Sequence, residues 1–327
     1  MIKVIGGSGF IGTRLSKRLD ENNSEFSIVD KAMSKTFENI CSIADVRDIE
    51  SLSKVLNNND IIINLAAEHR DDVSPKTLYD DVNVQGARNI CEVAEQKGIN
   101  TIIFTSSVAV YGFAPLGTKE DGEINYFNDY GRTKYEAELV YKTWQEKDPK
   151  NRKLVIVRPT VVFGEQNRGN VYNLLRQIAS GKFMMIGDGK NRKSMAYVEN
   201  VAAFLEYSLG FEKGVHIYNY IDKPDFDMNT LVKNVNKALG KKEKVGFRMP
   251  FAIGYSIGKV FDLIALLTGK KFTVSSIRIK KFCSDSMFDT SIEKTGFTRP
   301  VKLENGLANT IKYEFVDKTQ DEVFYTE

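Results

Sequence analysis

A run of glycines directly after the first apolar segment constrains this chain more than any other feature. Residues 2–5 are typical of a short buried strand, and a helical stretch follows the glycines. The glycines are Gly6, Gly7, Gly9 and Gly12. Glycines at this spacing allow a tight turn and let the backbone approach a pyrophosphate, which the N–H groups and dipole of the helix N-terminus then stabilise. The loop therefore predicts a dinucleotide-binding β–α–β unit.

An acidic residue follows the loop at the expected distance. Asp30 closes the second predicted strand about 20 residues on, where a carboxylate binds the adenosine ribose and repels a 2′-phosphate. NAD is therefore favoured over NADP, although the adjacent Lys31 weakens the preference. A flexible glycine turn with a surface carboxylate is the alternative. Asp45 and Val46, after the next strand, are candidates for the adenine site, and a solvated Asp45 is equally consistent with the sequence.

Short apolar runs alternate with longer amphipathic stretches through the first half of the chain. The runs are unbroken and rich in Ile and Val, as in parallel strands covered on both faces. The predicted strands are residues 2–5, 26–29, 61–65, 101–105 and 153–157, and the predicted helices are 12–21, 49–56, 77–97 and 128–147. This alternation predicts an α/β fold with a Rossmann-like, doubly wound parallel sheet.

The regularity weakens after about Arg158, where Pro and Gly residues separate shorter elements. A chain of 327 residues is long enough for about two domains. We expect an NAD-binding domain over residues 1–165. A smaller C-terminal domain over 166–327 would mainly bind substrate, with room for strands that return to the first domain.

The composition excludes several classes of protein. Hydrophobic residues make up 42% and charged residues 27%, as in globular chains. The net charge of +3 does not favour binding to nucleic acid. Three cysteines without a CxxC pair and two histidines favour neither a disulfide framework nor a metal site, and reduced thiols suit the cytoplasm. The N-terminus lacks the long apolar region of a signal peptide.

Three side chains suited to proton transfer follow the predicted strands. Ser107 comes just after a strand, at the sheet edge where ligands of α/β folds bind. Tyr130 and Lys134 are one turn apart on a predicted helix and share a face. A phenol with a pKa of about 10 is a poor base, but a nearby ammonium and a cationic nicotinamide would lower that pKa. Tyr130 would then accept a hydroxyl proton while hydride leaves the same carbon, with Ser107 bonded to the oxygen; a structural helix pair is the alternative.

Over essentially its full length, the chain resembles the extended short-chain dehydrogenases/reductases. Within that superfamily its motifs are similar to those of nucleotide-sugar 4-epimerases. The motifs are GGSGFIG at 6–12, DVRD at 45–48, NLAA at 64–67, NVQG at 83–86, SVAVYG at 107–112, Tyr130-xxx-Lys134 and RPT at 158–160. The resemblance implies catalytic Ser107, Tyr130 and Lys134, and a homodimer packed through helices near 77–97 and 128–147. The expected NAD contacts are Gly6, Gly9, Phe10, Ile11, Gly12, Asp30, Asp45, Val46, Ala66, Asn83, Tyr130 and Lys134.

The residues after Ser107 narrow the reaction class. Related dehydratases and decarboxylases place acidic residues there, because elimination needs a further acid or base; this chain has Val108 and Ala109. Neither Cys91 nor Cys283 lies where GDP-sugar epimerase/reductases place a cysteine. What remains is oxidation at one carbinol and return of hydride to the other face, which is 4-epimerisation without net redox change. A net dehydrogenase and a non-catalytic NAD sensor are the alternatives.

Four further segments resemble the branch of the family that acts on undecaprenyl-diphosphate N-acetylglucosamine. They are residues 66–75, 168–175, 193–198 and 274–282. This resemblance implies a polyprenyl-linked diphospho-sugar, converted to the N-acetylgalactosamine form for surface polysaccharide such as the O-antigen of lipopolysaccharide. The expected substrate contacts are His69, Ser107, Asn170, Lys193 and Arg278.

Two departures from the soluble UDP-sugar enzymes point the same way. Lys193-Ser194 and the basic run at 278–281 retain cations for a diphosphate but do not match a uridine pocket. A solvated basic surface is the alternative for residues 278–281. A soluble UDP-sugar is the alternative substrate.

Residues 249–267 form the most apolar stretch of the second half. Pro250, Lys259 and Asp262 argue against a helix that spans a membrane. Basic residues on both sides would suit the interface of an anionic bilayer; they are Lys241, Lys242, Lys244, Arg248, Lys270, Lys271 and Lys280. The stretch therefore predicts either peripheral contact with the cytoplasmic face of the plasma membrane or a core helix of the substrate domain.

Overall fold

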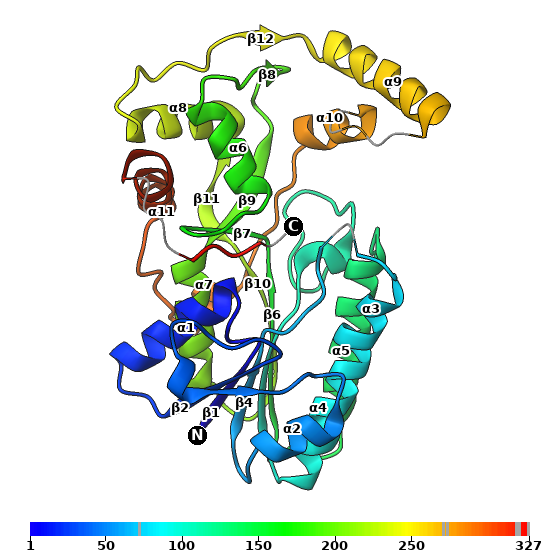
Figure 1. Ribbon diagram of the computed structural model, residues 1–327, viewed down its shortest axis with the longest axis vertical. Coiled ribbons are helices and arrows are strands. Elements are labelled where there is room, and N and C mark those ends of the chain that lie inside the picture. The colour runs from blue at the N-terminus through cyan, green and yellow to red at the C-terminus, as the bar shows by residue number, and fades with distance from the viewer. Residues whose placement is uncertain (71–72, 270–271, 273–274, 318–321, 326–327) are drawn as a thin grey trace.

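A large parallel sheet forms the lower part of the molecule in Figure 1, and smaller sheets and helices lie above it. The structure is a computed structural model that describes residues 1–70, 73–269, 272, 275–317 and 322–325. The seven strands of the large sheet have the order β10-β6-β5-β4-β1-β2-β3, and each pairing is parallel. They are β1 (Ile2–Ile5), β2 (Phe26–Asp30), β3 (Cys41–Ile43), β4 (Ile61–Asn64), β5 (Thr101–Thr105), β6 (Lys153–Pro159) and β10 (Gly214–Tyr220).

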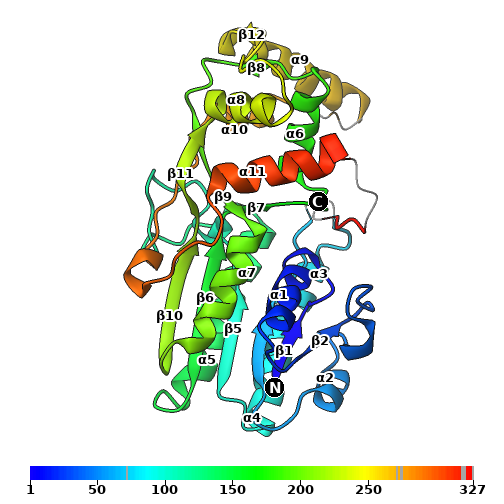
Figure 2. The same cartoon turned by 90° about the vertical axis from the view of Figure 1, so that its left-hand side faces the viewer.

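Helices cover both faces of this sheet, which confirms the predicted Rossmann-like α/β fold. On one face α1 (Phe10–Glu21) packs beside α7 (Val198–Tyr207), as Figure 2 shows from that side. The other face carries α2 (Ile49–Val55), α4 (Gly86–Gln96) and α5 (Asp129–Glu146). The strands are buried on both sides because each face has its own apolar core.

The sequence predicted five of the seven strands, all except β3 and β10, and three of the helices, α1, α2 and α5, to within two residues at each end. The helix predicted over residues 77–97 was wrong as a single α-helix. It consists of α3 (Thr77–Tyr79), a π-helical segment (Asp80–Gln85) and α4. A π-helical turn is wider than an α-helical one and often lies at a functional site.

A three-stranded sheet and a two-stranded sheet organise the upper part. The first joins β7 (Val161–Phe163), β9 (Arg192–Tyr197) and β11 (Asp222–Asp227), and the second joins β8 (Met185–Ile186) and β12 (Arg248–Met249). The helices are α6 (Asn170–Ala179), α8 (Met228–Ala238), α9 (Phe251–Thr268), α10 (Ser276–Cys283) and α11 (Leu303–Ile311). Short 3-10 or π turns are η1 (Glu38–Ile40), η3 (Val108–Tyr111), η4 (Ser208–Gly210), η5 (Ile292–Thr295) and η6 (Lys312–Asp317).

The two halves of the chain share the large sheet. Although β10 comes late in the chain, it pairs with β6 over seven residues. The functional division at residue 165 stays a prediction.

The glycine loop requires a close approach of backbone segments. A Cβ atom on Gly12 would lie 2.5 Å from the Gly7 Cα, and one on Gly6 would lie 2.6 Å from the Ala66 backbone nitrogen. Gly6 also has φ +77°, a conformation that other residues rarely adopt. Both contacts are with backbone atoms, so side-chain movement cannot relieve them.

We therefore expect Gly12→Ala to lower the free energy of unfolding by about 1–3 kcal/mol, the usual cost of overpacking. Urea unfolding measures this change. Gly210→Ala is the matched control, because a Cβ there meets nothing within 4 Å. Equal stability of the two variants would contradict the argument.

Candidate active site

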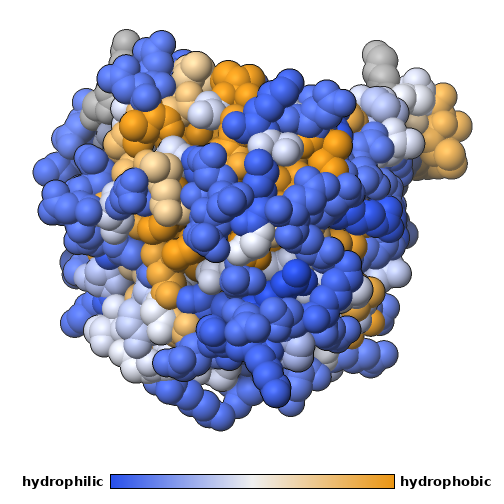
Figure 3. Space-filling view, turned by 90° about the horizontal axis from the view of Figure 1, so that it is seen from below, coloured by the Kyte–Doolittle hydropathy of each residue, from blue (hydrophilic) through white to orange (hydrophobic). Residues whose placement is uncertain are grey.

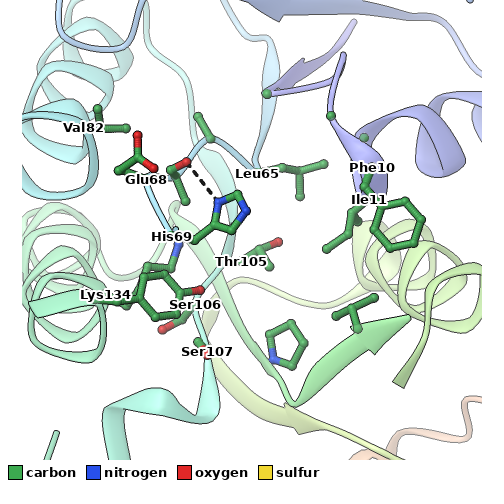
Figure 4. A pocket seen from close by; sticks show the side chains of 18 of the residues that line it. Phe10, Ile11, Leu65, Glu68, His69, Val82, Thr105, Ser106, Ser107 and Lys134 are labelled. Atoms are coloured by element: carbon green, nitrogen blue, oxygen red, sulfur yellow. Dashed lines mark hydrogen bonds between the residues drawn. The ribbon is translucent and has the colours of Figure 1, made fainter. Parts of the chain in front are cut away.

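A cavity of about 880 Å³ lies at the carboxyl edge of the large sheet. Its walls come from both halves of the chain, from the glycine loop through to Phe288 and Tyr325. The cavity holds most of the predicted site residues. They are Gly6, Gly9, Phe10, Ile11, Gly12, Asp30, Asp45, Val46, Ala66, His69, Ser107, Tyr130 and Lys134. Figure 4 shows the His69 ring between Lys134 on one side and Phe10 and Ile11 on the other.

The glycine-loop end of the cavity suits a dinucleotide. No described side chain caps α1 at Gly9, so the N–H groups of its first turn are available to a phosphate. Asp30 accepts hydrogen bonds from the backbone nitrogens of Ser8 (3.0 Å) and Ala32 (3.1 Å). This anchoring fixes the Asp30 carboxylate at the end of β2, where an adenosine ribose would bind.

Asp45 is ion-paired rather than simply solvated. The Arg47 guanidinium donates to both of its carboxylate oxygens, at 2.6 Å for the shortest bond. These hydrogen bonds hold the pKa of Asp45 below its ordinary value. Val46 touches Gly86, where a Cβ would lie 2.8 Å from a Val46 methyl group. Close packing of this kind shapes the wall that sequence analysis assigned to adenine.

Ser107 and Tyr130 both line the cavity and are joined by a side-chain hydrogen bond. Ser107 is the N-cap of η3, and its Oγ accepts a hydrogen bond from the Ala109 nitrogen at 3.1 Å. Tyr130 is in the first turn of α5, which Asn128 caps by accepting from the Gly131 nitrogen at 2.9 Å. Desolvation raises the pKa of Tyr130 to about 12, and a hydrogen bond with Ser107 partly opposes this rise.

Lys134 is buried on the same face of α5, with only 2% of its surface exposed. Its Nζ lies 4.4 Å from the centroid of the Phe104 ring. Burial lowers the pKa of Lys134 to about 7, although Glu138 acts in the opposite direction. The sequence predicted that Lys134 lowers the pKa of Tyr130, whereas in the protein alone this pKa is raised, chiefly by desolvation. That lowering stays a prediction for the site with NAD bound.

A buried network beneath the site was missed from the sequence. Glu138 accepts from Arg158 Nη2 at 2.6 Å and from Nε at 2.8 Å, and both side chains are almost fully buried. Glu138 also accepts from the Ser106 hydroxyl, next to Ser107. The Arg158 Nη1 donates to Tyr111 Oη at 2.6 Å. The spacing was a usable signal, because Glu138 lies four residues after Lys134 on the same helix face.

Asn83 does not line the cavity among the described residues. Its side chain accepts from the Glu68 nitrogen (2.9 Å) and donates to the Glu68 carbonyl (3.0 Å), which fixes the loop that follows β4. His69 on this loop does line the cavity, and desolvation lowers its pKa. Direct contact of Asn83 with the cofactor stays a prediction.

Three predicted substrate residues lie outside the described lining of the cavity. Asn170 begins α6, Arg278 lies on α10, and Lys193 Nζ donates to the Lys281 carbonyl at 2.8 Å. Their roles stay predictions. The motif residues Asp71, Asp72 and Val274, and the flanking Lys270 and Lys271, lie outside the described residues.

Other lining residues were missed because they come from distant segments. Ser286 and Phe288 reach the cavity through backbone bridges to Lys193 and Thr118. Asn167 and Tyr325 complete this wall. No local motif marks such positions, since long-range pairing places them. Within the described residues, no group of three His, Cys, Asp or Glu side chains is placed to hold a metal ion.

The fold and site define a class of protein. Residues 2–220 match the NAD dependent epimerase/dehydratase family, and the chain belongs to this family, as the sequence motifs predicted. NAD is its cofactor.

Individual relatives narrow the reaction and substrate within this family. The chain is 48% identical to N-acetyl-alpha-D-glucosaminyl-diphospho-ditrans,octacis-undecaprenol 4-epimerase of Escherichia coli O157:H7, covering 99% of this chain and 98% of the relative. It is 28% identical to UDP-glucose 4-epimerase of Vibrio cholerae, covering 82% and 85%.

Solved epimerase structures share the fold. UDP-N-acetylglucosamine 4-epimerase from Bacillus cereus matches with a TM-score of 0.74 at 17% identity, covering 96% of this chain and 99% of the other. UDP-glucose 4-epimerase from Thermotoga maritima, solved with UDP-glucose, matches with a TM-score of 0.73 at 21% identity, covering 98% and 99%.

The buried Lys134 gives a pH-dependent prediction for protein freed of NAD. Its pKa of about 7 in the folded chain lies below the ordinary value of 10.5. The unfolded chain binds more protons between these values, so wild-type stability rises with pH across this window. Lys134→Met removes the penalty, and we expect it to be about 1–4 kcal/mol more stable at neutral pH.

Urea unfolding at neutral pH and at about pH 9 tests this, because the advantage should shrink as pH rises. Lys142→Met, on the same helix, is the control. A Lys134→Met protein less stable than wild type at neutral pH would refute the interpretation.

Proposed function

We propose that the protein is an NAD-dependent sugar 4-epimerase that converts undecaprenyl-diphosphate N-acetylglucosamine to the N-acetylgalactosamine form. The observation that carries this proposal is the 48% identity with the Escherichia coli enzyme over almost the whole of both chains. The shared cavity of Ser107, Tyr130 and Lys134 supports it. The product would serve surface polysaccharide assembly, such as O-antigen.

Bound NAD supplies the acceptor and donor of hydride at the sugar C4. Tyr130 removes the 4-hydroxyl proton as a general base and returns it after the keto sugar has turned its other face. Ser107 hydrogen-bonds the same oxygen, and Lys134 holds positive charge next to the phenolate. With a pKa raised to about 12, Tyr130 is a phenol until positive charge favours its ionisation.

The residues around Ser107 explain why the reaction stops at epimerisation. Val108 and Ala109 line the cavity with apolar groups that cannot transfer protons. Elimination would require a further acid or base there. A ketone formed at C4 therefore has one productive fate, which is reduction from either face.

Helix α9 supports a peripheral contact with the membrane. By length and composition this helix could cross a bilayer. Only 11% of it is buried inside the protein, so the alternative of a core helix was wrong. Gly254 and Gly258 are its buried residues, and large apolar side chains face outward. In Figure 3 hydrophobic side chains gather on the projection where α9 ends. We propose that α9 lies in the cytoplasmic interface of the plasma membrane.

The contacts of Asp262 suit this placement. Its carboxylate accepts hydrogen bonds from the backbone nitrogen and hydroxyl of Ser276 on α10. The one acidic side chain of α9 therefore faces protein rather than the exposed apolar surface. The exposed basic residues before the helix, including Lys242 and Lys244, would face anionic headgroups.

We also propose a homodimer that packs through α4 and α5, because the resemblance to the extended short-chain dehydrogenases/reductases implies one. These helices bound a groove lined by Cys91, Leu139, Val140 and Trp144, and Leu139 is 44% exposed. We expect light scattering to give a dimer, and Leu139→Arg to give a monomer, because a long charged side chain would replace an apolar contact between the two copies. Val215→Arg is the control, since Val215 is 43% exposed on β10. A monomeric wild type would refute this.

The reaction itself is tested with purified protein, NAD and lipid-linked N-acetylglucosamine. We expect N-acetylgalactosamine in the lipid-linked product, no accumulation of NADH, and loss of about 10²–10⁴-fold in kcat for Tyr130→Phe. Asp129→Asn, at the neighbouring and more exposed position, is the control. Conversion of UDP-N-acetylglucosamine, with no conversion of the lipid-linked sugar, would defeat the substrate assignment.

Membrane contact is tested by flotation with vesicles that contain anionic lipid. We expect Leu266→Ser combined with Leu267→Ser to reduce binding at least about tenfold, because these side chains are 81% and 76% exposed on α9. The control combines Ile43→Ser with Val215→Ser on the large sheet. Undiminished flotation of the α9 variant would exclude this helix as the contact.

A further inference from the structure

An exposed aromatic surface lies between the cavity and α9, and the proton and hydride transfers described above do not involve it. Phe113 is 68% exposed and Phe127 is 56% exposed, yet their rings pack edge to face with centroids 4.7 Å apart. Lys281 of α10 places its Nζ 4.3 Å from the Phe127 centroid and 5.7 Å from that of Phe113. We use the term aromatic surface for Phe113, Phe127 and Lys281.

The aromatic surface is continuous with the active site along the chain. Phe113 follows Gly112, which lines the cavity, and Phe127 precedes the Asn128 cap of the helix that carries Tyr130. Both rings are therefore held by the segments that hold the catalytic groups. Figure 1 shows the loop between η3 and α5 approaching α10 from below.

The same surface is continuous with the cavity from the α10 side. The Lys281 carbonyl accepts from Lys193 Nζ at 2.8 Å, and Lys193 bridges to Ser286, which lines the cavity. Lys281 thus lies at the point where the cavity wall meets the aromatic rings. Among the described residues, the contacts of its ammonium are with these rings.

On its far side the aromatic surface leads toward α9. Helix α10 packs directly on α9, where a Cβ on Gly258 would lie 2.8 Å from the Ser276 Cα. Ile277 on α10 is 52% exposed, and Leu263 on α9 is 56% exposed. Exposed apolar side chains are therefore present on α10, which carries Lys281, and on α9, the helix proposed to lie in the membrane interface.

We propose that the aromatic surface binds the substrate's polyprenyl diphosphate, with Lys281 at the diphosphate and the two rings against the first isoprene units. This proposal rests on the proposed function and names the lipid site of that enzyme. A cation adjoining apolar rings fits an anion that continues into a hydrocarbon chain. A nucleoside diphosphate could stack its base on the rings but would leave the exposed apolar side chains of α10 and α9 in water. A hydrocarbon chain on the diphosphate would contact both.

The test compares Phe113→Ser/Phe127→Ser with the matched Phe113→Leu/Phe127→Leu protein. With undecaprenyl-diphosphate N-acetylglucosamine in vesicles, we expect the serine variant to raise KM about tenfold or more, with little change in kcat. The leucine variant should recover most of the loss, because it restores apolar area. Lys281→Gln should raise KM also.

A second substrate separates this site from general damage. With a water-soluble diphosphate sugar that carries a methyl group in place of the prenyl chain, and therefore no isoprene unit, the serine variant should differ less from wild type, while vesicle flotation and thermal stability stay unchanged. Equal loss with both substrates, or unchanged KM with the long-chain lipid, would overturn the proposal. So would loss of the dimer in the serine variant, which would make the surface an interface between copies. Failure of wild type to convert any lipid-linked sugar would instead reject the proposed function.

Discussion

The buried ion pair between Glu138 and Arg158 connects the parts of the site that must stay in register. Glu138 belongs to the helix that carries Tyr130 and Lys134, and Arg158 belongs to a central strand. The Ser106 hydroxyl also donates to Glu138, which ties the strand end before Ser107 to the same carboxylate. Removing one partner of such a pair costs about 3–5 kcal/mol, because an uncompensated charge is left buried. The pair therefore fixes the relative positions of strand end and helix.

The network reaches the last strand of the sheet as well. Arg158 donates to Tyr111, and Tyr111 donates to Asn219 on β10 at 2.8 Å. β10 comes from the second half of the chain, so the site forms only when that half has returned to the sheet. Folding of the second half of the chain is therefore coupled to formation of the cavity that contains Ser107, Tyr130 and Lys134.

Local patterns made the first half of this fold predictable. The glycine loop, Asp30 and the Tyr130–Lys134 pair each depend on spacing within one or two elements, and all of them line the cavity. Ser286 and Phe288 reach the cavity by pairing with residues far away in sequence, which no local pattern records. The π-helical segment escaped prediction for a related reason, since its Asn83 bonds to Glu68 on another loop.

The predicted substrate residues also show that a local motif does not fix which side chains reach the cavity. Lys193 and Arg278 were assigned as direct contacts by resemblance, yet the described cavity lining includes neither. Lys193 instead bonds to the Lys281 carbonyl and so supports the end of α10. A motif identifies residues that belong to a site. Strand register decides whether such a residue contacts the ligand or supports another residue that does.

Desolvation acts on Tyr130 and Lys134 in opposite directions, and both shifts favour their neutral forms. In a region of low dielectric, a charge placed beside either group has a larger effect than it would in water. The pKa values of Tyr130 and Lys134 should therefore change strongly when a group of opposite charge binds next to them. If the proposed function holds, a lipid-linked sugar would enter this site from the bilayer, and its hydrocarbon chain would need an apolar path out of the cavity. Glycines at the contacts of α9 let that helix pack closely while its large side chains face outward. Glycines in the loop after β1 likewise let backbone segments approach one another, and this would also leave room for a pyrophosphate.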